Sequence, residues 1–269
     1  MTNYLIEKYY RTERLPHIWC PGCGNGIVLK AIVKAIDNLN LNQNEVCVVS
    51  GIGCSSRATG YLDFNTVHTT HGRALAFATG IKFANPKLHV VVITGDGDCA
   101  AIGGNHLIHA ARRNIDITTI VFNNNIYGMT GGQYSPTTPT GDKGTTAPYG
   151  NIDPNFDLCE LAKSAGATYV SRSTVYGVNM ITKQVEEGIK NKGFSFIEIL
   201  TTCPTYYGRK NKKGNAAEMI KQLNEITINV NAYNNLPQEK RENKIVIGEL
   251  YKDIREEYTE KYDRLIKSF

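Results

Sequence analysis

Two polar groups that could bind a metal follow two apolar segments of the sequence. Gly95-Asp96-Gly97 comes directly after the β-branched run 88–93, and Asn124 lies just beyond a similar run at 117–122. Short apolar runs that stop at glycine or polar residues predict buried strands. The carboxyl ends of neighbouring parallel strands share one crevice, which is where open α/β sheets bind ligands. We therefore expect Asp96 and Asn124 to face the same crevice.

The chemistry expected there is metal-assisted binding of a diphosphate. Mg²⁺ prefers oxygen ligands and completes its coordination with phosphate oxygens and water. The glycines let the backbone approach a diphosphate, and the N-terminus of the following helix favours its negative charge. A lone Gly-Asp-Gly also occurs in plain surface turns, so the pair formed with Asn124 is what favours a metal site.

Four of the seven cysteines are candidate ligands of a second metal centre. Cys20 and Cys23 flank a Pro-Gly turn, which can direct amide N–H groups at the sulfurs. Cys54 lies in a glycine-rich loop after one predicted strand, and Cys203 follows the last one. Four thiolates fit either Zn²⁺ or a [4Fe–4S] cluster, and spacing does not decide between them. The first pair alone is also compatible with a zinc knuckle or with a turn that carries two idle thiols.

The remaining cysteines and histidines have more ordinary interpretations. An odd number of irregularly spaced cysteines argues against a disulfide framework. Cys47 and Cys159 read as packing residues, because a free cysteine packs as a small hydrophobe. His71, beside Gly72, is a candidate for contact with a diphosphate, whereas His68 reads as structural.

The order of the predicted elements indicates an α/β fold, a doubly wound parallel sheet. We expect residues 1–19 to form an N-terminal arm, residues 20–204 the cofactor-binding domain, and residues 205–269 a C-terminal extension without chemistry of its own. The expected strands are 46–50, 88–93, 117–122, 167–170 and 194–200. The expected helices are 26–38, 74–84, 99–113, 157–165 and 178–190, with 216–224 and 250–267 in the extension.

Two polar stretches leave alternatives open. The Pro/Thr/Gly-rich segment 135–150 has the composition of a lid or binding loop, or of a surface excursion. The charged runs 209–213 and 239–244 predict solvated surface, with a docking patch for an acidic electron carrier or a partner subunit as the alternative.

Composition excludes several classes of protein. The chain has 269 residues, 41% hydrophobic and 20% charged, as in ordinary globular proteins. It has no apolar run of the roughly 18 residues that a membrane span requires, and its polar start has no signal-peptide core. The net charge of +5 is too modest to argue for nucleic acid. We therefore expect a cytoplasmic protein that binds neither membranes nor nucleic acid.

Taken together, the motifs resemble the β subunit of 2-oxoacid:ferredoxin oxidoreductases over most of residues 10–205. The segment Tyr127-Gly-Met-Thr-Gly-Gly-Gln133 points to the 2-oxoglutarate type. The motifs that carry the resemblance are Cys20-Pro-Gly-Cys23-Gly, Gly51-Ile-Gly-Cys54-Ser, His71-Gly-Arg, Gly95-Asp-Gly, Asn124-Asn-Ile-Tyr-Gly-Met-Thr-Gly-Gly-Gln133 and Cys203-Pro.

The resemblance implies the thiamine diphosphate-binding (PP-type) fold and three cofactors: thiamine diphosphate, Mg²⁺ and one [4Fe–4S] cluster. It places the cluster on Cys20, Cys23, Cys54 and Cys203. It assigns Mg²⁺ to the side chains of Asp96 and Asn124 and the carbonyl of Ile126. Contacts with thiamine diphosphate are implied for Ile52, Gly53, Cys54, Ser55, His71, Gly97, Asp98, Gly128 and Met129.

The implied activity is oxidative decarboxylation of 2-oxoglutarate with coenzyme A to succinyl-CoA and CO₂. Electrons would pass through the cluster and on to ferredoxin. A redox cluster next to a carbanion-forming cofactor can accept its electrons, whereas a structural zinc ion cannot. Thiamine enzymes also need a glutamate at the aminopyrimidine, and this chain offers no convincing candidate. The family supplies it from an α subunit, so we expect no confident catalytic residue here and a chain that is incomplete alone, with further small subunits possible.

Three other functions remain open. The nearest is the same chemistry on pyruvate, branched-chain 2-oxoacids or indolepyruvate. The second is a non-oxidative thiamine-dependent lyase or synthase with a structural Cys₄ zinc site. The third is a metal-binding scaffold that kept the fold and lost the cofactor.

Overall fold

The centre of the molecule is an eight-stranded sheet with the order β2-β1-β3-β4-β8-β7-β10-β9. The computed structural model describes residues 2–269. The strands β1, β2, β3, β4, β7 and β8 are parallel, and β10 runs antiparallel to β7. The strands of this sheet are β1 (Val46–Ser50), β2 (Asn65–His68), β3 (His89–Gly95), β4 (Thr118–Asn123), β7 (Tyr169–Thr174), β8 (Ser195–Leu200), β9 (Thr227–Asn229) and β10 (Ile245–Lys252). A separate hairpin pairs β5 (Ile126–Tyr127) with β6 (Gln133–Tyr134).

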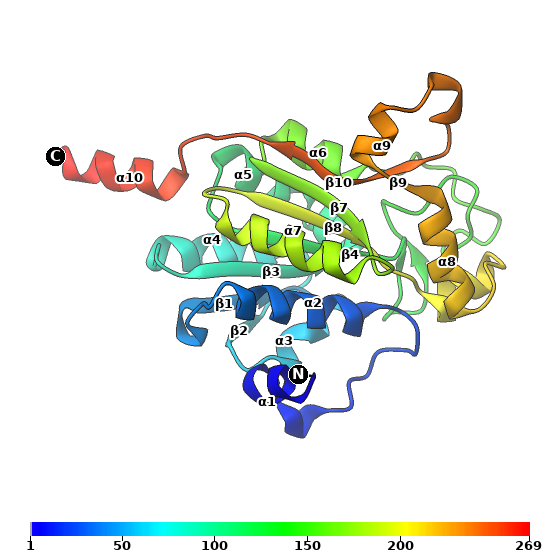
Figure 1. Cartoon of the computed structure of the whole chain (residues 1–269), viewed down its shortest axis with the longest axis horizontal. Helices are drawn as coiled ribbons and strands as arrows, with labels where there is room; N and C mark the ends of the chain where they lie inside the picture. The colour runs from blue at the N-terminus through cyan, green and yellow to red at the C-terminus, as the bar shows by residue number, and fades with distance from the viewer. Residues whose placement is uncertain (1) are drawn as a thin grey trace.

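Helices cover both faces of this sheet, which confirms the doubly wound architecture (Figure 1). The helices are α1 (Thr2–Tyr9), α2 (Asn25–Asn38), α3 (Ala58–Tyr61), α4 (Ala74–Ala84), α5 (Gly104–Arg113), α6 (Leu158–Ala165), α7 (Val178–Lys190), α8 (Ala216–Ile226), α9 (Val230–Asn234) and α10 (Tyr258–Lys267). The helices α2 and α7 pack on one face, and α4, α5 and α6 on the other. None of the described helices is long and apolar enough to cross a bilayer.

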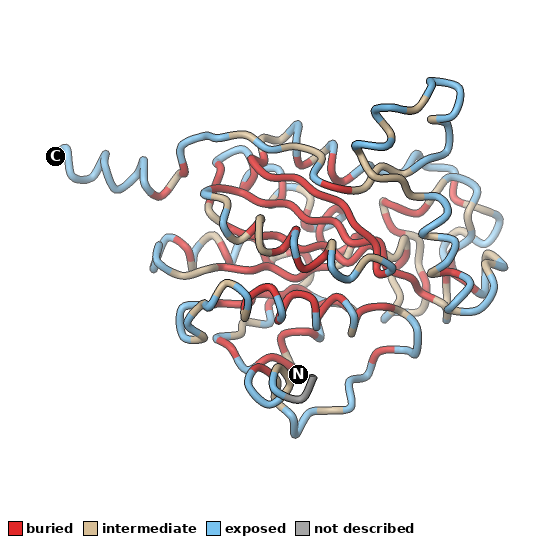
Figure 2. The backbone as a smooth tube through the Cα atoms, in the orientation of Figure 1, coloured by how far each residue is buried: buried red, intermediate tan, exposed pale blue. Residues whose placement is uncertain are grey.

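The strand residues alternate between the two resulting cores. In β3, Val91 and Ile93 join the core under α2 and α7, whereas Val90 and Val92 join the core under α4 and α5. A strand that is covered on both faces needs apolar residues at successive positions, which explains its unbroken run of β-branched side chains. Figure 2 shows these strands as the buried centre of the molecule.

All five predicted strands are present, β1 with the predicted bounds and the other four with shifted ones, and the sheet also contains β2, β9 and β10. The predicted helix 99–113 begins as a π-helical turn over Asp98–Ile102 and continues as α5. The predicted helix 216–224 corresponds to α8, which starts at a capping box formed by Asn215 and Glu218. Side chains of this type at both ends of the first turn satisfy amide groups that the helix leaves free.

The predicted helix 250–267 is wrong in its first part. Residues Ile245–Lys252 form β10, in which Gly248 pairs with Arg172 of β7, and α10 begins only at Tyr258. The run Ile245-Val-Ile is β-branched, and the free edge of β7 supplies its partner, so sheet pairing prevails over local helical spacing. The C-terminal segment therefore adds two strands to the main sheet before α10 projects from the body (Figure 1).

We expect removal of β10 to destabilise the whole sheet. A chain ending at Lys244 uncovers the edge of β7 and loses the packing of Leu250 and Tyr251 against the core, at a cost of about 3 kcal/mol. Its thermal midpoint should fall by roughly 10 °C. A chain ending at Glu257 keeps β10 and serves as the control. Equal midpoints for both truncated chains, measured by circular dichroism, would contradict this role of β10.

Candidate functional site

A cleft with an empty volume of about 570 Å³ lies at the carboxyl ends of β1, β3 and β4. It brings together every residue that the sequence assigned to thiamine diphosphate and Mg²⁺. The residues shared by the prediction and the cleft wall are Ile52, Gly53, Cys54, Ser55, His71, Asp96, Gly97, Asp98, Asn124, Ile126, Gly128 and Met129. Segments far apart in the sequence therefore meet at one edge of the sheet.

Asp96 is held at this edge by two hydroxyl groups. Its carboxylate oxygen Oδ2 accepts hydrogen bonds from Ser135 Oγ at 2.5 Å and from Thr137 Oγ1 at 2.7 Å. The side chain is 3% exposed, and burial raises its pKa to about 6, while the two hydroxyl donors act in the opposite direction. A nearby cation would favour the ionised carboxylate. The surroundings of Asp96 therefore suit a carboxylate that binds a cation.

The three asparagines after β4 form a tight turn that presents Asn124. The side chain of Asn123 accepts a hydrogen bond from the amide of Asn125 at 3.0 Å, and that of Asn124 accepts one from the amide of Ile126 at 3.2 Å. Asn125 has a φ of 59°, a left-handed conformation that asparagine tolerates. The turn directs the chain straight into β5, so Asn124 and the carbonyl of Ile126 lie at the cleft wall.

Two glycines are required by close approaches at the cleft. A Cβ atom at Gly97 would collide with the ring of Tyr127, whose hydroxyl donates to the Gly97 carbonyl at 3.1 Å. Burial, together with the carboxylates of Asp96 and Asp98, raises the pKa of Tyr127 to about 12. A Cβ atom at Gly128 would lie 3.4 Å from the sulfur of Cys203 and 3.6 Å from that of Cys54. Gly128 therefore lies in the cleft wall and directly beside the sulfur atoms of Cys54 and Cys203.

Asp98 connects three loops at the cleft. Its Oδ1 accepts from the amides of Gly72 at 2.7 Å and Ile52 at 3.2 Å and lies 2.6 Å from His71 Nδ1, while Oδ2 accepts from Thr94 at 2.7 Å. An ionised carboxylate only accepts, so the His71 Nδ1 carries a proton and Nε2 is free to act in the cleft. The carboxylate of Asp98 is thus occupied by the protein itself and orients the other cleft residues.

The four predicted sulfur ligands also converge. The Cys20–Cys23 turn is bound to the Cys203 segment, because Thr202 donates from its amide to the Cys23 carbonyl at 3.1 Å and from its hydroxyl to the Gly22 carbonyl at 3.0 Å. Burial and the neighbouring thiols raise the pKa of Cys54 to about 11 and also raise that of Cys23, on which the Asn25 amide acts in the opposite direction.

The sulfur spacing bears on the kind of metal centre. In the part of the chain that the structure describes, no three of these sulfur atoms lie within 4.8 Å of one another. Tetrahedral Zn²⁺ with Zn–S bonds of about 2.3 Å would need sulfur atoms about 3.8 Å apart. A cubane cluster spreads its four thiolates more widely, because each binds a different iron atom. The described thiols are therefore not gathered as closely as in a closed zinc site.

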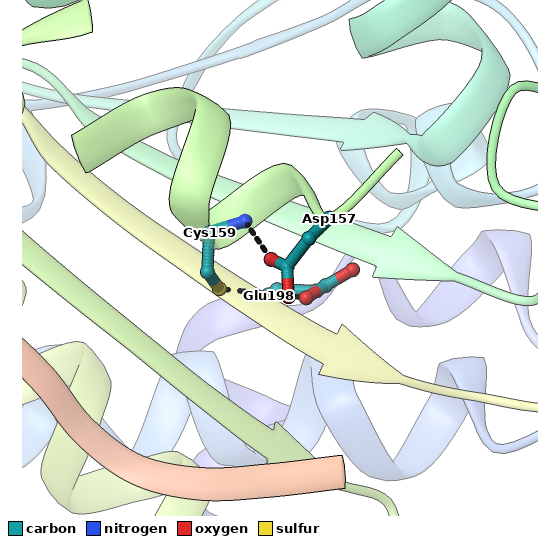
Figure 3. Close-up of side chains that lie close together, drawn as sticks. All are labelled: Asp157, Cys159 and Glu198. Carbon is teal, nitrogen blue, oxygen red and sulfur yellow. Dashed lines mark hydrogen bonds between the residues drawn. The ribbon is translucent and has the colours of Figure 1, made fainter. Parts of the chain in front are cut away.

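The other cysteines are buried away from this set. Cys47 and Cys99 lie in the core with exposures of 4% and 2%. Cys159 packs as predicted, but its sulfur, with Asp157 and Glu198, forms a group whose potential ligand atoms lie within 4.8 Å of one another (Figure 3). Arg172 already donates to both carboxylates of this group, at 2.5 Å each, so it is an ion-pair cluster rather than an open cation site.

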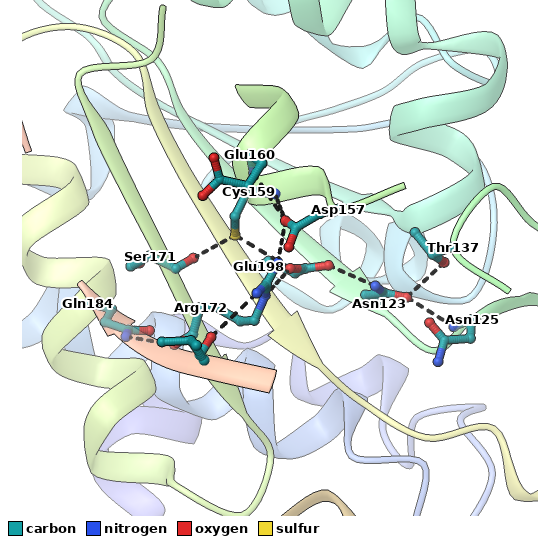
Figure 4. A network of polar contacts seen from close by, with 11 residues as sticks. Asn123, Asn125, Thr137, Asp157, Cys159, Glu160, Ser171, Arg172, Gln184 and Glu198 are labelled. Atoms are coloured by element: carbon teal, nitrogen blue, oxygen red, sulfur yellow. Dashed lines mark hydrogen bonds and ion pairs between the residues drawn. The ribbon is translucent and has the colours of Figure 1, made fainter. Parts of the chain in front are cut away.

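The structure also shows polar residues that the sequence reasoning missed. A continuous set of hydrogen bonds runs from Arg172 through Glu198 and Asn123 to Thr137 (Figure 4). The available signal was a glutamate inside the otherwise apolar strand Ser195–Leu200, since a buried charge needs a partner.

The segment 135–150 is a structural part of the site rather than a free surface excursion. Ser135 and Thr137 reach Asp96, and Thr138 donates to the Asn125 carbonyl at 2.6 Å. Farther along, Tyr207 donates its hydroxyl to Asp142, which ties the loop to the chain after Cys203. The beginning of the loop is buried and anchored, so a binding role fits it better than that of a lid.

Comparison with known proteins identifies the kind of domain and its relatives. The model of the thiamine pyrophosphate enzyme C-terminal TPP-binding domain matches residues 51–199. The 2-oxoglutarate synthase subunit KorB of Methanocaldococcus jannaschii is 55% identical over 97% of this chain and 96% of the relative. The same subunit of Archaeoglobus fulgidus is 51% identical over 96% and 92%.

A solved structure is also similar to this chain. It is a 2-oxoglutarate:ferredoxin oxidoreductase from Magnetococcus marinus with 2-oxoglutarate, coenzyme A and succinyl-CoA bound. It matches with a TM-score of 0.87 and 30% identity and covers 98% of this chain and 90% of that one. The chain therefore belongs to the family of 2-oxoacid:ferredoxin oxidoreductase β subunits, thiamine diphosphate enzymes, as its motifs predicted.

Proposed function

We propose that this chain is the thiamine diphosphate-binding subunit of a 2-oxoglutarate:ferredoxin oxidoreductase that converts 2-oxoglutarate and coenzyme A to succinyl-CoA and CO₂. The observation that carries the proposal is the convergence of Asp96 and Asn124 on one cleft, with the sulfurs of Cys54 and Cys203 beside Gly128 of its wall and the Cys20–Cys23 turn bound to the Cys203 segment. The names of the relatives at 51–55% identity support 2-oxoglutarate as the substrate. Ferredoxin is the proposed electron acceptor.

The cleft residues fit a magnesium-bound diphosphate. Asp96 and Asn124 would hold Mg²⁺ with side-chain oxygens, and Ile126 with its carbonyl, which is the oxygen-rich set that this ion prefers. Gly53 has a φ of 126°, and a Cβ there would meet no atom within 4 Å, so the backbone is open to a ligand. The remaining assigned contacts, Ile52 to Ser55, His71, Gly97, Gly128 and Met129, surround the same space.

The task of the protein is to position and enclose. When bound, thiamine diphosphate supplies an electron sink for decarboxylation, and the iron–sulfur cluster accepts electrons. Asp98 lies 2.6 Å from His71 Nδ1 and so fixes the ring of His71 at the cleft wall. Gly128 lies in the cleft wall beside the sulfurs of Cys54 and Cys203, and Trp19 donates to the Cys54 carbonyl at 2.6 Å and so fixes the Cys54 loop.

The sulfur set supports a [4Fe–4S] cluster on Cys20, Cys23, Cys54 and Cys203. The zinc-containing lyase or synthase would place a single Zn²⁺ on the same four thiolates. The Thr205 hydroxyl lies 3.4 Å from the sulfur of Cys20, and the Asn25 amide faces that of Cys23. Donors of this kind tune the potential of a cluster.

The site requires a second subunit. No glutamate is among the described residues that line the cleft, so the aminopyrimidine partner has to come from an α subunit. Ile52 and Met129 at the cleft are 41% and 43% exposed, as expected for a surface that a partner covers. Additional small subunits are compatible with this arrangement. We also propose a cytoplasmic location, which suits seven free thiols.

The magnesium assignment predicts a defect in cofactor binding. Asp96→Asn removes the anionic ligand, and we expect the Mg²⁺ concentration needed for half-maximal binding of thiamine diphosphate to rise at least about tenfold. Isothermal titration calorimetry measures this change. Asp263→Asn makes the same chemical change at an exposed position of α10 and should leave binding unaltered. Equal binding by both variants would argue against Asp96 as a ligand.

The cluster assignment predicts a brown, oxygen-sensitive protein. Anaerobic purification should give about four iron atoms and four sulfides per chain, with visible absorption. Cys203→Ala should lower the iron content sharply, whereas Cys47→Ala, at another buried cysteine, should retain it. A colourless protein with one zinc ion per chain would instead support the structural zinc alternative.

The need for an α subunit predicts that the chain alone, loaded with its cofactors, turns over no 2-oxoglutarate. Addition of the α subunit should restore formation of succinyl-CoA, followed by reduction of a ferredoxin or a viologen dye. Rates with pyruvate, a branched-chain 2-oxoacid and indolepyruvate should be lower by an order of magnitude or more. Turnover without the α subunit, or a preference for pyruvate, would overturn this part of the proposal.

A further inference from the structure

We propose that Glu198 is a positioning residue that sets the orientation of the Asn123 amide and thereby holds both magnesium side chains, Asp96 and Asn124. The inference rests on the proposed magnesium site. Glu198 lies on β8, under the sheet edge that carries the cleft, and is no part of the cleft wall. Figure 4 shows the contacts of Glu198 with Arg172 and Asn123, and those of Asn123 with Asn125 and Thr137.

First, Arg172 and Glu198 form a buried ion pair with a fixed geometry. Arg172 and Glu198 occupy paired positions of the neighbouring strands β7 and β8. Arg172 Nε donates to Glu198 Oε2 at 2.5 Å, and Nη2 donates to Asp157 Oδ1 at 2.5 Å. The two paired residues are 7% and 2% exposed. One oxygen of Glu198 is therefore committed to Arg172, and a buried carboxylate needs a donor for the other.

The second step determines which way the Asn123 amide points. Glu198 Oε1 accepts from Asn123 Nδ2 at 2.7 Å. An ionised carboxylate cannot donate, so the NH₂ group of Asn123 must face Glu198 and its carbonyl oxygen must face the opposite way. The charge of Glu198 thus removes the choice between the two orientations of a side-chain amide.

The third step links this orientation to Asn124. The Asn123 carbonyl oxygen accepts from the Asn125 amide at 3.0 Å, which closes the turn that carries Asn124 between them. Turns of this kind, in which an asparagine side chain bonds the backbone two residues on, depend on an acceptor in that position. A reversed amide would set two donors against each other and open the turn.

The fourth step links the same oxygen to Asp96. Thr137 Oγ1 lies 3.0 Å from Asn123 Oδ1 and 2.7 Å from Asp96 Oδ2, so its single proton serves both acceptors. Thr137 is 3% exposed, so its hydroxyl is largely withdrawn from bulk solvent. Asn123 is consequently the common point from which both proposed side-chain ligands of Mg²⁺ are held.

Two substitutions separate this role from simple packing. Glu198→Gln keeps the shape of the side chain, but its amide oxygen must turn to Arg172, which leaves its NH₂ group facing Asn123. The Asn123 amide then has to reverse, and its NH₂ group meets the amide of Asn125. Thr137→Val keeps the shape of threonine and removes the shared hydroxyl, whereas Thr137→Ser retains it.

The test measures thiamine diphosphate binding to the full chain by calorimetry over a series of Mg²⁺ concentrations. We expect E198Q and T137V to raise the Mg²⁺ concentration for half-saturation tenfold or more. T137S should stay within about threefold of the wild type. Glu7→Gln, the same chemical change at an exposed position of α1, should leave the requirement unchanged. The thermal midpoint of the metal-free protein is recorded for each variant.

Each outcome bears on the inference. A lower thermal midpoint with an unchanged Mg²⁺ requirement in E198Q and T137V would overturn it, because the residues would then be structural only. Since E198Q removes a buried charge and could fail to fold, the T137V and T137S pair decides in that case. A wild-type chain without Mg²⁺-dependent binding would overturn the proposed magnesium site and, with it, this inference.

Discussion

The carboxyl ends of β1, β3, β4 and β8 lie at one edge of a parallel sheet, and everything else in the site depends on that alignment. Strand pairing in register brings the loops that carry Cys54, Asp96, Asn124 and Cys203 to the same edge. Neither cofactor site exists along the chain, since each takes residues from segments widely separated in the sequence. The double layer of helices that buries the strands on both faces is therefore a condition for the chemistry as well as for stability.

At this edge of the sheet, burial disfavours the ionised forms of the proposed ligand side chains, and a bound cation would favour them. The Asp96 carboxylate and the thiols of Cys23, Cys54 and Cys203 are partly or fully buried, whereas Cys20 is exposed. Burial raises the pKa of Asp96, Cys23 and Cys54. Cations or iron at these positions reverse that effect, because a positive partner favours the ionised ligand. By contrast, the carboxylates of Asp98 and Glu198 are fully used by donors of the chain itself. Residues that would bind a cofactor thus lack a positive partner among the described residues of the chain, whereas the carboxylates that position those residues already have donors.

The sequence indicated the residues that line the cleft, but it did not indicate the buried polar residues that hold them in place. Motifs of glycine, cysteine and asparagine can be recognised in a sequence because few other residues can replace them. Glycine allows a close approach of the backbone, cysteine binds metals, and asparagine suits tight turns. Asp98 shows what the motif leaves out: it lines the cleft, where the resemblance places a cofactor contact, but its carboxylate also binds the Ile52 loop, the His71–Gly72 loop and Thr94 of β3. Ser135, Thr137 and Glu198 escaped notice, because a hydroxyl in a loop or a single charge in a strand gains meaning only from its spatial neighbours. β10 was misread for the same reason, since the free edge of β7 is invisible in local spacing.

The central claim is that a magnesium-bound diphosphate site and an iron–sulfur site adjoin across Gly128. Anomalous X-ray diffraction from anaerobic crystals grown with thiamine diphosphate and Mn²⁺ in place of Mg²⁺ tests it most directly. The account predicts a manganese signal between Asp96 and Asn124 and an iron signal enclosed by Cys20, Cys23, Cys54 and Cys203. Manganese bound elsewhere, or a zinc signal alone among the cysteines, would contradict it.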